Sequence, residues 1–189
     1  MCLNDLNLPK KANKARYFVI SCFTFSLLSM IGIIAHIWAM ALRAGGKDWE
    51  GAIGAGTIGV ISGILPLIGS SILMCCAPKS AQEGCAGGKF IAAAVLLLIG
   101  GIIQLIVSVT VLGIMIALLN QMNKRPYCRN GYAEVRQICH EDKQIVVLVF
   151  GISIAFFLIS GILNTIGGAY CIKAKSAIAA QAQNGGAAT

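Results

Sequence analysis

Charged side chains are scarce in this sequence. Asp, Glu, Lys and Arg make up 12% of its 189 residues, whereas about a quarter of the residues of a soluble domain are charged. Charges are absent from four long stretches, residues 17–42, 51–78, 90–123 and 144–172. Each stretch exceeds the ~20 apolar residues that span a hydrocarbon core. The scarcity excludes an ordinary soluble domain and indicates a polytopic membrane protein with four spans.

Sequence motifs of enzymes and nucleotide-binding sites are also missing. No GxxxxGK[ST], HExxH or GxSxG pattern occurs, and no acid or base with a partner charge lies within an apolar stretch. A net charge of +8 would indicate nucleic acid as a partner of a soluble protein. Here the basic residues flank the apolar stretches, which favours lipid headgroups and disfavours nucleic acid. We therefore expect no enzymatic activity, no cofactor and no bound metal.

The apolar stretches predict an all-α fold, a four-helix transmembrane bundle with up-down topology. The first two spans form an antiparallel hairpin because their connection is short. A basic segment before the first span resembles that of a signal peptide, but the apolar run of about 22 residues exceeds the usual 7–15, which favours a retained anchor. We expect spans at residues 17–42, 51–76, 90–119 and 145–172, outer loops at 43–50 and 120–144, a cytosolic tail at 1–16 and a disordered cytosolic tail at 173–189.

One face of the second span consists of small residues and one proline. Hydrophobicity does not drive helices together in lipid, whereas close backbone approach between small residues does. We therefore expect this span to make the tightest helix–helix contact of the bundle. Its helix-packing residues, at steps of three and four, are Ala52, Gly56, Gly59, Gly63, Pro66 and Ser70.

Four polar residues within the spans could carry chemistry. Ser29, Gln104 and Ser160 lie near the midpoints of their spans, and Asn164 lies one turn beyond Ser160. One interpretation is a polar pathway for an ion or small solute. The other is hydrogen bonding between helices. The second is favoured because none of the four residues is charged.

Two cysteines, Cys128 and Cys139, enclose a polar segment of the second outer loop. On an oxidising side of the membrane they would form a disulfide. Two free thiols are the alternative. A zinc site that includes His140 is disfavoured because the spacing lacks a CxxC pair.

Three further cysteines, Cys75, Cys76 and Cys171, fall at the opposite ends of spans. Juxtamembrane cysteines on the cytosolic side are acylation candidates, and small buried hydrophobes are the alternative. The basic residues before the first span favour a cytosolic N-terminus, and four spans place both termini on that side. The long spans suit a thick, sterol-rich plasma membrane.

The chain resembles the membrane-spanning four-domain family. The resemblance rests on the short first outer loop, Trp49 before the second span, the small-residue run that ends at residues 61–65, and the cysteine pair in the second outer loop. It implies homo- or hetero-oligomers that organise receptors or modulate ion flux at the plasma membrane. We expect a non-enzymatic membrane organiser or adaptor whose partners are lipids and other membrane proteins. The alternative is a channel or small-solute transporter lined by Ser29, Gln104, Ser160 and Asn164.

Overall fold

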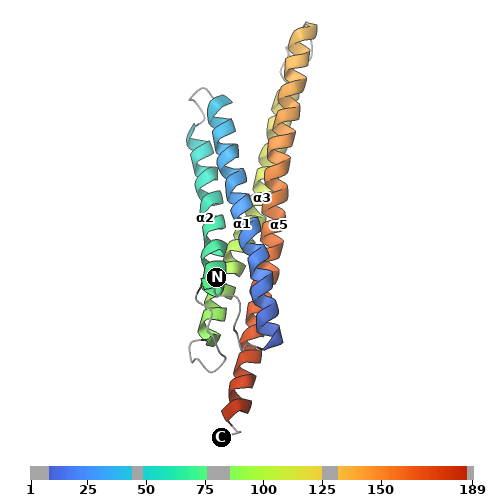
Figure 1. The fold of residues 1–189 in the computed structure, drawn as a ribbon. Helices are drawn as coiled ribbons and strands as arrows, with labels where there is room; N and C mark the ends of the chain where they lie inside the picture. Colours follow the sequence, from blue (N-terminus) through green and yellow to red (C-terminus); the bar gives the residue numbers. More distant parts are fainter. Residues whose placement is uncertain (1–8, 44–48, 76–85, 125–131, 187–189) are drawn as a thin grey trace.

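The computed structural model describes residues 9–43, 49–75, 86–124 and 132–186. Within these ranges the regular structure is entirely α-helical, as predicted. The helices lie side by side (Figure 1). They are α1 (Lys10–Arg43), α2 (Trp49–Cys75), α3 (Ala86–Lys124) and α5 (Ala133–Gly186).

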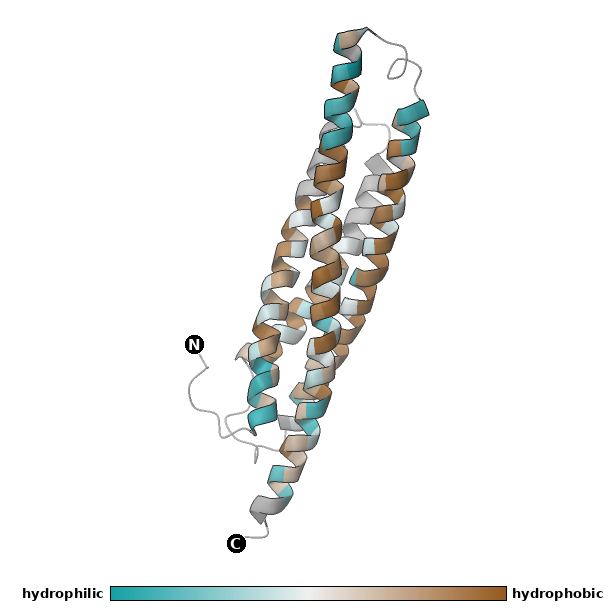
Figure 2. Ribbon diagram, turned by 90° about the vertical axis from the view of Figure 1, so that its right-hand side faces the viewer, coloured by the Kyte–Doolittle hydropathy of each residue, from teal (hydrophilic) through white to brown (hydrophobic). Residues whose placement is uncertain are grey.

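Three segments of the described helices are long and apolar enough to cross a membrane. They are Lys10–Gly32 in α1, Gly87–Lys124 in α3 and Arg136–Gln183 in α5. In α2, whose side chains are described only from Gly59 to Met74, the apolar segment covers that whole range. Hydrophobic residues dominate the middle of the helices and hydrophilic ones gather toward their ends (Figure 2). These features agree with the predicted integral membrane protein.

All four helices contribute to one buried apolar cluster. The cluster lies around the first turns of α1, and many of its side chains are small, so the helices can approach closely there. Arg16, which is only 5% exposed, borders it and donates from Nε to the Leu73 carbonyl in the last turns of α2, at 3.3 Å. A cation is favourable at a helix C-terminus. The members are Ala12, Ala15, Val19, Cys22, Leu73, Phe90, Ala93, Ala94, Leu97, Cys171, Ala174 and Ile178.

Helix ends differ from the predicted segment boundaries. Helix α1 begins at Lys10, inside the predicted tail, and α3 and α5 extend into the predicted loop at 120–144. Helix α5 also continues to Gly186, where a disordered tail was predicted. The reason is packing, because Ala174 and Ile178 are buried in the apolar cluster.

The most extensive helix contact joins α3 to α5. Extent is not closeness, so the expectation that α2 makes the tightest contact stays a prediction. At the centre of the α3–α5 contact two glycines bring the backbones together. A Cβ atom on Gly161 would lie 3.0 Å from the Gly101 carbonyl oxygen, and one on Gly101 would lie 2.9 Å from that of Gly161. Glycine is therefore required on both helices.

The small-residue face of α2 packs against two neighbours. Its described members Gly59, Gly63, Pro66 and Ser70 are buried; the side-chain positions of Ala52 and Gly56 lie outside the described part. A Cβ atom on Gly63 would collide with the Met30 side chain of α1. One on Gly100 of α3 would collide with the Pro66 ring. At its described positions the small-residue face is therefore buried between α1 and α3, and its close contacts are mainly with side chains, not with backbone.

Replacing Gly161 with Leu should destabilise the fold by about 1–3 kcal/mol, the usual cost of overpacking, because the new side chain meets backbone and Leu105. Thermal unfolding in detergent measures the effect. Gly113→Leu is the control, since nothing lies within 4 Å of a Cβ atom there. Equal unfolding temperatures for the two variants would contradict the tight α3–α5 contact.

Candidate functional site

A cluster of polar side chains lies buried between α1, α3 and α5. Helix α1 contributes Ser26 and Ser29, α3 contributes Gln104, and α5 contributes Ser160 and Asn164. All five are essentially inaccessible to solvent. Residues three or four apart share a helix face, so each pair from one helix points to the same side. The sequence predicted four of them as candidate site residues, all except Ser26, and the structure brings these four together.

Gln104 is the centre of this cluster. Its Oε1 accepts hydrogen bonds from Asn164 Nδ2 at 2.8 Å and from Ser160 Oγ at 3.0 Å. Its Nε2 donates to Ser29 Oγ at 3.5 Å, the longest bond of the set. One amide therefore links α3 to both α1 and α5.

Asn164 connects α5 to α1 within the cluster. Its Nδ2 also donates to Ser26 Oγ at 3.0 Å, while Ser29 Oγ donates to the Ser26 carbonyl at 2.8 Å. Ser26 was not predicted as a site residue. Its spacing of one helical turn from Ser29 was the signal that could have identified it.

The chemistry available to the cluster is limited to neutral hydrogen bonding. It contains hydroxyl and amide groups only, which supply donors and acceptors but no general acid, general base or activated nucleophile. Both functional groups of the Gln104 amide are engaged with protein atoms. The arrangement is that of a polar link between three helices.

Cys171 lies in the apolar cluster and is fully buried with a free thiol. The burial argues against its prediction as an acylation site, because an acyl chain needs an accessible sulfur. It matches instead the alternative of a small buried hydrophobe. Helix α5 continues past Cys171, so the residue lies inside the packed region. Cys75 ends α2 with a side chain outside the described part, and Cys76 lies outside the described residues.

Cys139, on α5, is buried at 8% exposure and is not one of the free thiols of the described residues. Its predicted partner Cys128 falls outside those residues, so the pairing stays a prediction. The neighbouring His140 is exposed. In the described ranges, no three His, Cys, Asp or Glu side chains gather as a metal site would require.

Comparison with known proteins identifies no relative of this chain: no family model, curated protein or solved structure matches it. The buried cluster and the exposed surface are therefore the features that bear on its function.

The Gln104–Asn164 bond can be tested by a double-mutant cycle with Gln104→Leu and Asn164→Leu. We expect a coupling free energy of roughly 0.6–1.7 kcal/mol, the range from average to maximum for hydrogen bonds between membrane helices. Chemical unfolding in mixed micelles provides the measurement.

Ser108→Ala is the matched control for this cycle, because the Ser108 hydroxyl donates only within α3, to the Leu105 carbonyl at 2.7 Å. It should couple to neither substitution. Strictly additive effects of the two Leu substitutions would show that the amides do not cooperate.

Proposed function

We propose that the protein is a four-span integral membrane protein that acts as a non-enzymatic organiser or adaptor by associating laterally with other membrane proteins. The observation that carries this proposal is the buried polar cluster. Polar groups within an apolar bundle either line a path or bind one another. Here Ser29, Gln104, Ser160 and Asn164 bind one another, which supports a structural role.

The four-span, up-down bundle is supported by helix length and order. Helix α2 has 27 residues and, at 1.5 Å per residue, measures roughly 40 Å, enough for a ~30 Å hydrocarbon core. Along the chain the helices alternate in direction, and the start of α1 lies toward the same end of the molecule as the end of α5 (Figure 1). We place that end in the cytosol because basic residues precede the first span.

The lateral surface would be the outer face of α3. Its aliphatic side chains are strongly exposed, with Ile102 at 52%, Ile106 at 60% and Val109 at 68%. In a bilayer such a ridge meets lipid tails or the helix of another protein, and helix association then depends on packing. This ridge gives an organiser a surface for membrane partners.

The proposal also includes the roles of four cysteines. A Cys128–Cys139 disulfide would constrain the outer loop, and Cys75 and Cys76 would remain the cytosolic acylation candidates. The resemblance to the membrane-spanning four-domain family fits this arrangement at the plasma membrane, in homo- or hetero-oligomers.

A channel or small-solute transporter is the second candidate. It is favoured by one observation, the gathering of the four predicted polar residues between three helices. Ion and solute flux into proteoliposomes separates the two functions. An organiser gives no flux above that of empty liposomes. Flux that Gln104→Leu abolishes and Ser108→Ala preserves would establish the pathway instead.

Lateral association is tested by energy transfer between copies labelled with donor and acceptor at low protein-to-lipid ratio. Ile106→Ala combined with Val109→Ala should reduce transfer at least twofold, because the pair removes the centre of the α3 ridge. Ile31→Ala combined with Ile34→Ala, on exposed positions of α1, is the control. Transfer that the α3 pair leaves unchanged would exclude this ridge as the surface for self-association.

A further inference from the structure

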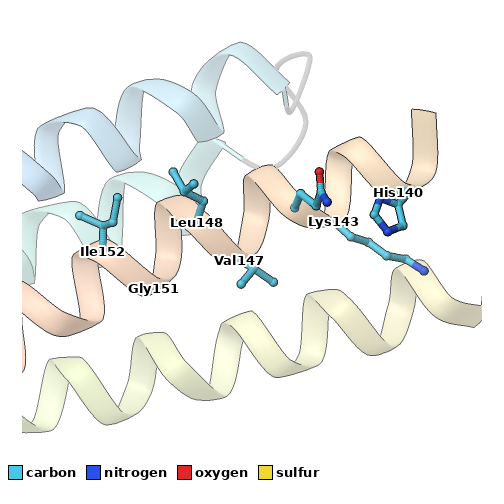
Figure 3. Close-up of a pocket in the computed structure, with 7 residues that line it drawn as sticks. His140, Lys143, Val147, Leu148, Gly151 and Ile152 are labelled. Atoms are coloured by element: carbon cyan, nitrogen blue, oxygen red, sulfur yellow. The ribbon is translucent and has the colours of Figure 1, made fainter. Parts of the chain in front are cut away.

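A groove of about 750 Å³ runs along one face of α5, near the end of the helix that begins at Ala133. Its lining residues recur at steps of three, one, three, one, three and one, so they form a single stripe on the helix. In Figure 3, Leu148 and Ile152 project toward the side of α1 and α2, while Val147 projects toward α3. The lining residues are His140, Lys143, Gln144, Val147, Leu148, Gly151 and Ile152.

The groove is polar at one end and apolar along the rest. His140, Lys143 and Gln144 occupy the first turn, and only apolar side chains and Gly151 follow. The division coincides with the start of the charge-free stretch at residue 144, which places Lys143 at the membrane interface. This is the order in which a phospholipid presents its headgroup and its acyl chain.

Lys143 is positioned to bind an anion. Its Nζ donates to Asn123 Oδ1 of α3 at 2.6 Å, which fixes the ammonium between the two helices. An ammonium has three donors, so donors remain for a second partner. His140 adds a ring N–H. The nearby acids Glu141 and Asp142 do not line the groove. Glu141 accepts a hydrogen bond from Gln137 at 3.1 Å on the same helix, and Asp142 has an interaction partner of its own.

The dimensions also favour a lipid. From Lys143 to Ile152 the helix rises roughly 13–14 Å, close to the ~15 Å depth of the hydrocarbon in one leaflet. The groove volume falls within the ~300–1,000 Å³ typical of small-molecule sites.

We propose that this groove binds one anionic phospholipid of the adjacent leaflet, with its phosphate at Lys143 and an acyl chain along Val147, Leu148 and Ile152. In the orientation proposed above this is the outer leaflet, which holds fewer anionic lipids than the cytoplasmic leaflet, so the site selects a minor lipid. The inference rests on membrane insertion, a part of the proposed function, but it does not depend on the organiser role.

Native mass spectrometry of the purified protein in micelles doped with phosphatidylglycerol or phosphatidylcholine tests the site. The wild type should retain one phosphatidylglycerol per chain in preference to phosphatidylcholine. Gly151→Leu should lower retention at least fivefold, because nothing lies within 4 Å of a Cβ atom there and the side chain can fill the groove without a clash. Gly113→Leu, on an equally open position of α3, should retain the lipid.

The headgroup contact is tested separately. Lys143→Gln should weaken phosphatidylglycerol binding about fivefold, the effect of one basic residue near an anionic headgroup, and leave phosphatidylcholine unchanged. Asn123→Ala removes the hydrogen bond to Lys143 but keeps the ammonium, so it should retain most binding.

Three results would overturn the proposal. One is equal lipid retention by Gly151→Leu and the wild type, and another is equal affinity for the two lipids. The third is a Gly151→Leu variant that dissociates an oligomer, which would assign the groove to a second copy of the chain. Carbonate extraction of cell membranes separates these results from a failure of insertion. A protein released by carbonate would refute the transmembrane proposal, whereas an inserted protein without retained lipid would refute only the site.

Discussion

The hydrogen bond between the side-chain amides of Gln104 and Asn164 depends on how closely α3 approaches α5. Inside a hydrocarbon layer no water compensates an unpaired amide, so a buried Gln must find its partners within the protein. Gly101 lies one turn before Gln104, and Gly161 lies one turn before Asn164. Because neither glycine has a side chain, the helices come close enough for the 2.8 Å contact. The close approach of the α3 and α5 backbones is thus a condition for the hydrogen bond between the two amides.

The packing differs along the length of the molecule. Near the start of α1 all four helices share a core of small and aliphatic side chains, and Arg16 ties α1 to the end of α2. Toward the other end of α5 the side chains of Ile145, Leu148 and Ile152 are about half exposed or more, and a groove opens beside them. Among the described residues, protein contacts are dense at one end of the bundle, whereas α5 carries an exposed apolar face toward the other end.

The sequence predicted the apolar helices and the polar residues that meet between them, because a spacing of three or four residues places such groups on one face. Helix ends were predicted less well, since hydropathy marks where lipid begins, not where a helix stops. Cys171 illustrates the difference: it closes the apolar stretch, yet α5 continues and buries it. The extensive α3–α5 contact was not predicted, because it depends on single glycines at matching heights, which are less conspicuous in the sequence than the small residues of α2.

The length of α5 has a mechanical consequence. Its 54 residues form one continuous helix, which at 1.5 Å per residue is roughly 80 Å long, well over twice the thickness of a hydrocarbon core. It carries Cys139 near one end and Ile178 near the other without an intervening loop. Helix α5 packs against α3 along much of this length, from Gly161 near Gly101 to Lys143, whose Nζ donates to Asn123 Oδ1. The segment around Cys139 and the packed α1–α5 contact are therefore joined by unbroken helix, so the rotation of α5 about its axis is the same at both.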